Sequence, residues 1–328
     1  MKRVLKLVVL ICSSALLGMP THNTMAHDIS LPTNIDQFEL VSITDDVYAV
    51  HGILGLPDQQ NRAFISNSGV IISDHGVIVI DSGGSLQVGK LLLQRIEAIT
   101  DKPVIAVFNT HIHGDHWLGN TAIKEAHPDA VFFAHANAIE KLRNGAAEEW
   151  LDIMKRMIDD DITNGKLVLP DAPLNGGETF QVDGIELKTH HTGHAHTDND
   201  IMLESPSHKV LFTGDIVEHR RAVSVDVPQD FSARGQIDAI RYLLDLPVDI
   251  YVPGHGETGS REIPESSLRF LEILYGSVKR YYQQDLQDFE MRDKVVADLA
   301  EFQDWSGMDQ IGKLISSVYL QVEAEEFE

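Results

Sequence analysis

The sequence predicts an α/β fold in which strand-like and helix-like segments alternate. Apolar residues recur at every second position through much of residues 38–81, as they do in half-buried strands. Helical spacing, with apolar residues three or four positions apart, follows at residues 86–99. The same order recurs between residues 104 and 250. Such alternation is typical of sheets that are covered by helices.

Strands dominate the first part of the chain, because β-branched and aromatic residues recur there and glycines separate the runs. An amphipathic helix is expected over residues 86–99, since Leu91, Leu92 and Ile96 share one face. A buried strand is expected at residues 104–108. The strands predicted before that helix are residues 38–43, 47–51, 63–67, 70–73 and 77–81.

The second half of the chain contains further strands and two helices. We expect the helices over residues 139–158 and 237–244, where the apolar spacing is again helical. Internal repeats and low-complexity segments do not occur in the sequence. The strands between the helices are predicted near Val131, Ile185, Ile201, Val210 and Ile250.

Residues 264–328 differ from the rest, because helical spacing continues there without strand-like runs. Phe270, Leu274 and Val278, for example, recur at every fourth position. We predict a helical C-terminal extension packed on a domain of residues 27–263. Its aromatic side chains either line a substrate entrance or, as we favour, pack in the core or at a dimer contact; they are Tyr275, Tyr281, Tyr282 and Trp305.

Residues 1–26 are typical of a secretory signal peptide. They combine a charged start, an apolar run over residues 4–17 and small residues that end at Ala26. The apolar run is too short for a comfortable membrane span. We therefore expect a periplasmic or secreted chain that starts at His27 and has no stable membrane association; an uncut anchor is the alternative. The only cysteine, Cys12, lies in the signal segment.

The composition argues against a nucleic-acid partner. Removing Lys2, Arg3 and Lys6 with the signal changes the formal net charge from −24 to −27, because no acidic residue precedes Asp28. An acidic surface repels phosphates, and nucleic-acid binding normally needs a basic footprint. The short basic run at residues 219–221 more readily anchors a loop. A small-molecule substrate is therefore expected, while the sequence leaves the oligomeric state open.

Metal-ligating residue types gather directly after the strand predicted at residues 104–108. His111, His113, Asp115 and His116 lie within six positions of one another, and alternation at 111 and 113 suits a loop that leaves a strand. Further ligand types follow the ends of later strand-like runs. These are His194, His196, Asp215 and His255.

Four segments in this order resemble the metallo-β-lactamase superfamily. They are HxHxDH at 111–116, GHAHTDND at 193–200, FTGD at 212–215 and PGHG at 253–256. Residues 79–84, a strand that ends in Asp81 and small residues, are similar to the first motif of the family. The resemblance implies a four-layer αββα sandwich with a metal centre at one sheet edge.

The resemblance also implies a ligand set for two Zn²⁺ ions, with iron and manganese as alternatives. Asp215 would bridge the ions, and Asp81 would orient the ligand loop through hydrogen bonds. His194 is a weaker candidate than His196, and His190 or His191 would support the site from outside. The first ion would be held by His111, His113 and His196, and the second by Asp115, His116 and His255.

The expected activity is that of an exported dinuclear zinc hydrolase. A hydroxide shared by the ions would attack an ester, thioester, lactone or lactam carbonyl, with Asp115 and Asp215 as the catalytic carboxylates. The cysteine-containing β-lactamases of the family carry a thiolate where this chain has Asp215, so β-lactamase activity is not favoured. Glyoxalase II-like enzymes are similar in this respect, and residues 298–323 resemble the tails of exported metallohydrolases associated with sulfur oxidation and quinoproteins.

Two other functions stay open at this point. One is a mononuclear iron enzyme resembling persulfide dioxygenases; the diiron oxygen reductases of the family, in contrast, have Glu in place of His113. The other is a non-enzymatic periplasmic protein that binds or relays metal ions. Substrate specificity would lie in the loop at residues 52–62 and in the tail. Four apolar side chains either form a substrate wall or, as we favour for each of them, serve as packing: Leu54, Leu56, Phe64 and Trp117.

Overall fold

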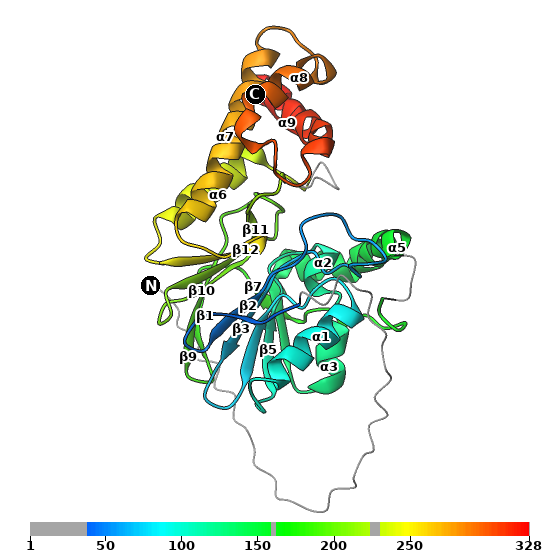
Figure 1. The fold of residues 1–328 in the computed structure, drawn as a ribbon, viewed down its shortest axis with the longest axis vertical. Coiled ribbons are helices and arrows are strands. Elements are labelled where there is room, and N and C mark those ends of the chain that lie inside the picture. Colours follow the sequence, from blue (N-terminus) through cyan, green and yellow to red (C-terminus); the bar gives the residue numbers. More distant parts are fainter. Residues whose placement is uncertain (1–37, 159–161, 224–229, 328) are drawn as a thin grey trace, which may run out of the picture.

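The computed structural model describes residues 38–158, 162–223 and 230–327. Its two sheets lie face to face in the body of the molecule, and a group of C-terminal helices extends from one end (Figure 1). The predicted signal segment, residues 1–26, lies outside the described residues. Export of the protein therefore stays a prediction. Within the described ranges, no helix has the length and apolar character needed to cross a membrane.

The first sheet has seven strands in sequence order, from β1 to β7. Its first four strands pair antiparallel, whereas β4, β5, β6 and β7 pair in parallel. The fourth strand is buried at every position, as its continuous apolar run requires. The strands are β1 (Val41–Thr44), β2 (Val47–Val50), β3 (Ser68–Ile72), β4 (Val77–Ile80), β5 (Val104–Phe108), β6 (Val131–His135) and β7 (Ala172–Leu174).

The second sheet has five strands in the order β12-β11-β10-β9-β8. β11 and β12 pair in parallel, and the other neighbours pair antiparallel. The parallel pair matters for the site, since both strands deliver functional residues at their carboxyl ends. The strands are β8 (Thr179–Val182), β9 (Ile185–His190), β10 (Met202–Ser205), β11 (Val210–Glu218) and β12 (Ile250–His255).

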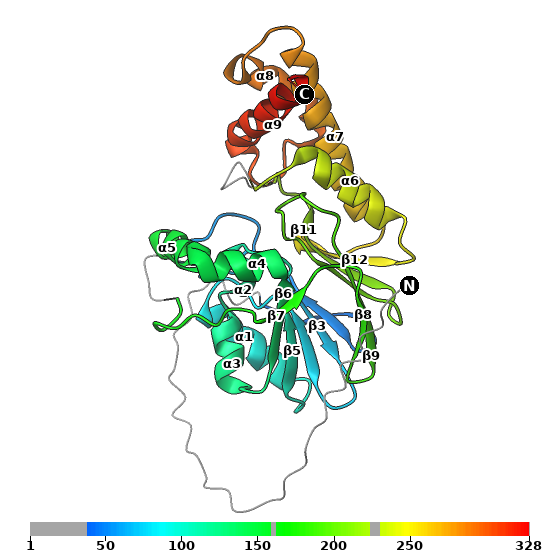
Figure 2. The same cartoon turned by 180° about the vertical axis from the view of Figure 1, so that it is seen from behind.

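Helices cover the outer faces of both sheets, which gives four layers (Figures 1 and 2). Between the sheets, Ile78 and Phe108 pack with Leu203 and Phe212. Helices α1 (Leu86–Glu97) and α3 (Asn120–Ala126) lie on the seven-stranded sheet, and α6 (Ala233–Leu244) and α7 (Glu262–Tyr282) on the five-stranded sheet. The predicted α/β fold with an αββα sandwich is confirmed.

Three further helices lie near the edge of the first sheet. The long helix expected over residues 139–158 is present, but it is interrupted. Gly145, with φ at 118°, stands inside a π-helical turn at Leu142–Ala146, so two helices replace one. The helices are α2 (Gly114–Trp117), α4 (Ala136–Lys141) and α5 (Ala147–Ile158).

The C-terminal extension is helical, as predicted. It comprises α7, α8 (Asp288–Asp298) and α9 (Ile311–Glu326), with short 3₁₀ turns at Ala300–Phe302 and Met308–Gln310. Its aromatic residues serve mainly as packing: Trp305 stacks on Phe270 with ring centroids 5.2 Å apart, and Tyr275, Tyr281 and Tyr282 pack on the same core.

One predicted strand is wrong. Residues 63–67 form a tight turn, in which Phe64 N donates to Asn61 O and Asn61 Oδ1 accepts from Ala63 N. Arg62 and Ala63 adopt φ values of 53° and 60°, which no strand contains. The turn is buried, and its apolar composition therefore resembles that of a strand. The short strands β7 and β8 were not predicted, because they carry little apolar alternation.

Candidate metal centre

The ligand-rich loop begins where β5 ends. His111 and His113 lie in this loop, and Asp115 and His116 lie in the single helical turn of α2. The loop is held in place by two hydrogen bonds: Asn199 Oδ1 accepts from Ile112 N at 3.0 Å, and the Trp117 indole donates to Ile112 O at 2.8 Å. The indole of Trp117 is fully buried, so this aromatic residue packs beneath the loop and does not form a substrate wall.

The second sheet and its loops supply the remaining side chains. Asp215 lies in β11, His255 ends β12 and His196 lies in the loop that follows β9. Gly254 is required at its position, because a Cβ there would lie 1.8 Å from Asp215 Oδ1. The carboxylate of Asp215 thus occupies the space that any other residue at position 254 would fill.

Four of these side chains form a first group, and all four are buried. His113 Nδ1 lies 3.1 Å from His196 Nε2. Asp215 Oδ2 lies 3.5 Å from His196 Nε2 and 3.8 Å from His111 Nε2. The potential ligand atoms of the group are within 4.8 Å of one another. These are the residues expected around the first ion, together with the expected bridge.

The second group contains Asp115, His116 and His255. Asp115 Oδ2 lies 3.5 Å from His116 Nε2 and 3.4 Å from His255 Nε2. Asp215 also contacts this group, since its Oδ1 lies 3.2 Å from His116 Nε2 and its Oδ2 lies 3.2 Å from His255 Nε2. One carboxylate therefore lies between the two groups and touches both.

The separations in both groups fit ions held by shared ligands. Two ligand atoms that each lie about 2.1 Å from one tetrahedral ion are about 3.4 Å apart. The buried atoms without a hydrogen-bond partner within the described ranges include Nε2 of His111, His116 and His255, and Oδ1 of Asp215. Buried polar atoms in this state are rare, and a cation would satisfy them. Imidazole and carboxylate donors suit zinc, iron and manganese.

Hydrogen bonds behind the ligands fix the direction of the imidazoles. Asp81 accepts from Thr110 N, Thr110 Oγ1 and His116 Nδ1, each at 2.8 Å. His255 Nδ1 donates to Ile65 O at 2.7 Å, and His111 Nδ1 donates to Thr110 Oγ1 at 3.0 Å. Each bond occupies one ring nitrogen, so that Nε2 faces the centre. The hydrogen bonds expected between Asp81 and the ligand-rich loop are present.

Burial and charge act in opposite directions across the centre. Burial lowers the pKa of His111 and of His196 well below its ordinary value, which favours the uncharged imidazole in both. Burial opposes the charged form of His116 too, but neighbouring carboxylates, Asp215 first, raise its pKa well above the usual range. The surrounding imidazoles, with His255 foremost, outweigh burial at Asp215 and hold its pKa well below normal. The side chains of the two groups therefore favour a positive charge between them.

Comparison with known proteins identifies the family. The family model of the metallo-β-lactamase superfamily matches residues 61–255, which include every side chain of both groups. The chain belongs to the metallo-β-lactamase superfamily. A relative is the metallo-β-lactamase type 2 of Bacillus sp. (strain 170), which is 26% identical over 215 residues, or 64% of this chain and 74% of the relative.

Solved structures share the fold of this chain. The metallo-β-lactamase from Pontibacter korlensis aligns with a TM-score of 0.57 and 20% identity, over 72% of this chain and 99% of its own. A double mutant of the sec-alkyl sulfatase PisA1 aligns with a TM-score of 0.66 and 16% identity, over 87% of this chain and 50% of its own. Because the residues before α7 are fewer than 87% of the chain, the second alignment includes part of the C-terminal helices.

The histidines that surround His196 in sequence lie outside both groups. His194 Nε2 lies 2.8 Å from Asp230 O, and His191 donates to Asp200 O at 2.8 Å. His190 lies between Tyr242 and Glu204 on the five-stranded sheet. None of these three contacts a grouped side chain among the hydrogen bonds of the described chain. Of the four histidines between residues 190 and 196, only His196 lies against the side chains of the two groups.

Three residues near the centre were not singled out as site residues from the sequence. Gln236 Nε2 donates to the carbonyl oxygens of Asp215 and Ile216, at 2.8 and 3.0 Å. Arg221 Nη1 lies 3.3 Å from Glu218 Oε2, and both side chains are buried. In the sequence, Glu218 stands out only as a charged residue at the end of the apolar run of β11.

Proposed function

We propose that this member of the superfamily is a dinuclear metallohydrolase. The position of Asp215 supports the proposal most directly, because its oxygens lie 3.2 Å from both imidazoles of the second group and 3.5 Å from His196 Nε2 of the first group. A carboxylate so placed holds two ions close together and offsets their mutual repulsion. The proposed ligands are His111, His113 and His196 for one ion, Asp115, His116 and His255 for the other, and Asp215 for both.

The chain's own residues then have separate tasks. Bound divalent ions would supply Lewis acidity and lower the pKa of water from about 16 toward about 7. Asp115 has a carboxylate oxygen 3.4 Å from His255 Nε2, and from there it orients and accepts a proton of the attacking water. Asp81 holds His116 in one tautomer. A covalent intermediate on a serine or cysteine side chain is not needed.

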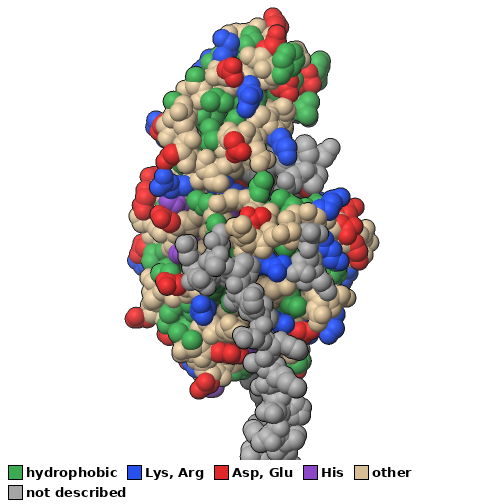
Figure 3. Space-filling model, turned by 45° about the vertical axis from the view of Figure 1, so that its right-hand side comes forward, with side chains coloured by type: hydrophobic (Ala, Val, Ile, Leu, Met, Phe, Trp, Pro, Cys, Tyr) green, Lys and Arg blue, Asp and Glu red, His purple; other side chains and the backbone are tan. Residues whose placement is uncertain are grey.

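The proposed substrates carry a carbonyl: an ester, a thioester, a lactone or a lactam. The named metallo-β-lactamase relatives make lactams a class to include in the assay. Sulfate esters are a second candidate, because the likeness to the sec-alkyl sulfatase extends into the C-terminal helices. Acidic and basic side chains are interspersed on the face in Figure 3, a distribution that suits a small-molecule partner better than a nucleic acid.

We propose zinc as the metal and export as the destination. Iron and manganese share the same ligand preferences, so elemental analysis of the purified chain decides between them. Two zinc ions per chain are expected. A single tightly bound iron with persulfide oxidation would support the dioxygenase alternative instead. N-terminal sequencing of the mature protein tests export, with His27 as the expected first residue.

Substitution of Asp215 tests the hydrolase proposal. Asp215→Ala is expected to leave the fold intact, to lower occupancy of the second site and to reduce hydrolysis on the order of a thousandfold. The assay compares nitrophenyl acetate, a thioester, a lactone, a chromogenic lactam and nitrophenyl sulfate. Two metals and near-full activity in Asp215→Ala would show that Asp215 is not the bridge. A metal-loaded wild-type chain inactive on every class would favour the binding or relay alternative.

A further inference from the structure

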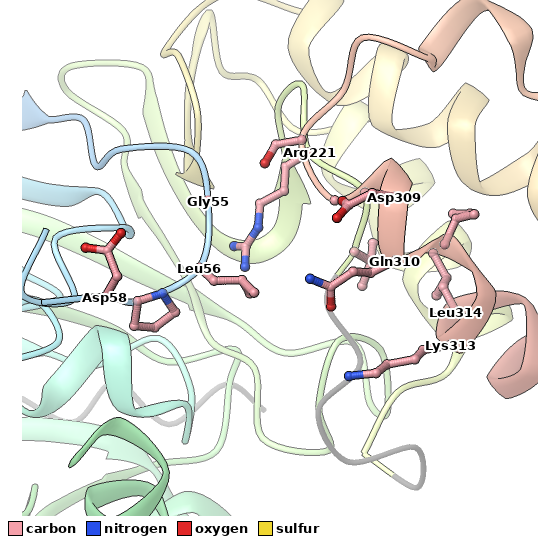
Figure 4. A pocket seen from close by; sticks show the side chains of 14 residues that line it. Gly55, Leu56, Asp58, Arg221, Asp309, Gln310, Lys313 and Leu314 are labelled. Carbon is pink, nitrogen blue, oxygen red and sulfur yellow. The ribbon is translucent and has the colours of Figure 1, made fainter. Parts of the chain in front are cut away.

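A cavity of about 350 Å³ lies where the C-terminal extension meets the domain. Its walls come from the loop at residues 55–58, from residues 221–223 and from residues 306–314 at the start of α9 (Figure 4). Small-molecule sites typically have volumes of about 300 to 1,000 Å³. The cavity is thus large enough for part of a substrate.

The extension is fastened to the domain beneath this cavity. Ala222 N donates to Ser306 O at 2.8 Å, and Ser306 N donates to Arg220 O at 3.0 Å. Next to these backbone bonds, Arg220 Nη2 lies 2.6 Å from Asp304 Oδ2. The walls therefore hold their relative position without a ligand, and binding would cost little ordering.

Both walls on the domain side belong to segments that hold the metal centre. Asn61 Nδ2 donates to Leu56 O at 2.8 Å and so closes the loop at residues 55–58. A few residues later, Ile65 O accepts the hydrogen bond that orients His255. On the other wall, Arg221 pairs with Glu218, which follows Asp215 in β11. A substrate part in the cavity therefore lies beside elements that position the second group.

The side chains directed into the cavity are mostly hydrogen-bond donors. Arg221 from one wall, and Gln310 and Lys313 from the other, point toward the same space in Figure 4. Asp58 is engaged with its own loop, since its Oδ1 accepts from Gln60 N and Asn61 N at 2.7 Å. Two cationic groups, of which Arg221 is paired with Glu218, and an amide thus face the space from opposite sides, together with the carboxylate of Asp309.

Apolar side chains complete the wall. Leu56 is 46% exposed, which leaves apolar surface that a ligand in the cavity would cover. Val223 and Leu314 line the same cavity and are otherwise buried. Asp309 is the second carboxylate of the wall, on the extension side.

We propose that this cavity binds an anionic head group joined to a short apolar segment. The donors would bind the anion, and Leu56 and Leu314 would cover the apolar part. That this ligand is a portion of the substrate rests on the proposed hydrolase function; the binding itself does not. The extension would thereby select anionic amphiphilic substrates over neutral ones.

Calorimetric titration of the full chain with three probes tests the proposal. Hexyl sulfate and hexanoate are expected to bind, and neutral hexanamide to bind at least about tenfold more weakly. Lys313→Glu should weaken binding of both anions about tenfold, because one attractive charge becomes repulsive. Lys294→Glu on α8 is the matched control, with the same charge change outside the cavity wall, and should bind like the wild type.

Two outcomes would overturn the proposal: equal affinity for hexanamide, or anion binding that Lys313→Glu leaves unchanged. The latter would place the anion at the metal centre. Asp309→Asn provides a second variant, which should tighten anion binding because it removes a repulsive charge. Binding measured in Asp215→Ala keeps this test separate from hydrolysis. A chain that binds hexyl sulfate but hydrolyses nothing would contradict the proposed function and leave the cavity assignment intact.

Discussion

Asp81 adopts a left-handed backbone conformation, with φ at 57°, at the end of β4. Such a conformation costs on the order of 1 kcal/mol for most residues, and Asp is among the few that tolerate it. At this position the carboxylate accepts hydrogen bonds from Thr110 and His116 together. Burial raises its pKa, while His116 and Thr110 act against that rise. A strained residue therefore couples the end of β4 to the ligand loop.

Asp81→Asn is expected to keep the fold but to weaken metal binding at the second site. Asn also tolerates the left-handed conformation, whereas its neutral amide is a poorer partner for the imidazole of His116. Loss of a supporting partner typically costs about 10- to 100-fold in metal affinity. Titration against a competing chelator measures the change. An unchanged affinity would mean that Thr110 and the loop alone orient His116.

His196 and His194 offer a matched pair two positions apart. His196→Ala should remove one ion and reduce hydrolysis on the order of a hundredfold or more, since a ligand is lost. His194→Ala should leave metal content and activity unchanged, because His194 contacts only Asp230 O among the hydrogen bonds of the described chain. Metal analysis with the same hydrolysis assay decides. Equal losses in both variants would contradict the ligand assignment.

Four of the residues that the sequence predicts as ligands lie close together in the chain. His111, His113, Asp115 and His116 lie within one run, and that local density predicts a metal site without tertiary information. Glu218 and Arg221 carry no comparable local signal. Their pairing depends on burial between β11 and the extension, which is a tertiary property that residue type and spacing do not encode.

At the scale of elements, the turn between β8 and β9 joins the two sheets. Asp183 in that turn accepts hydrogen bonds from Ser73 Oγ and from the backbone and side chain of His75. Both of these residues lie in the turn between β3 and β4 of the first sheet. Partial burial opposes ionisation, but the His75 and Ser73 hydrogen bonds outweigh it and lower the pKa of Asp183 from 3.8 to about 2. The ionised carboxylate therefore stabilises the contact between the sheets.

This contact gives a pH-dependent stability. Because the folded pKa of Asp183 is depressed, its contribution is present above pH 3.8 and is lost as the pH falls through about 2. Asp183→Asn should lower the free energy of unfolding by about 1 kcal/mol at pH 7, after allowance for solvent screening, and by nearly nothing near pH 2. Asn also suits the φ of 46° at this turn.

Urea unfolding at several pH values measures the effect. Asp101→Asn, at an exposed position, is the control and should change stability little at any pH. A loss for Asp183→Asn that is the same at pH 7 and near pH 2 would show that the charge is not involved.

Strands and helices with strong periodicity were predictable, and the exceptions have a common cause. β5 at Val104–Phe108 occurs where the sequence predicts it. The turn at residues 63–67 was misread because it is apolar through burial under the ligand loop. Positive φ values at Arg62 and Ala63 are imposed by contacts with Asp58 and Asn61, and periodicity cannot reveal them.

At the scale of the whole molecule, the extension shares one hydrophobic core with the second sheet. Leu274 and Phe270 of α7 belong to the same cluster as Leu211 of β11 and Tyr251 of β12. Residues of α8 and α9 complete that cluster, which also contains α6. The sequence predicted the helices of the extension, but only the structure reveals that α7 is part of the outer layer of the sandwich.

Leu274→Ala should therefore destabilise the entire protein and not the extension alone. Leu274 is fully buried, and removal of a buried leucine side chain costs about 2 to 5 kcal/mol. Leu320→Ala on α9 is the matched control, since Leu320 is 56% exposed and its loss should cost less than about 0.5 kcal/mol. Urea unfolding followed by circular dichroism and by release of bound metal measures both.

The two signals should shift together to lower urea concentration in Leu274→Ala. Because the core is shared, unfolding of α7 would expose Leu211 of β11 and Tyr251 of β12. The same two strands carry Asp215 and His255. In a contrary outcome, Leu274→Ala would lose helical circular dichroism at lower urea but release metal at the same urea concentration as the wild type. That result would mean that the extension unfolds independently. The stability of the metal centre would then depend on the sandwich without its C-terminal helices.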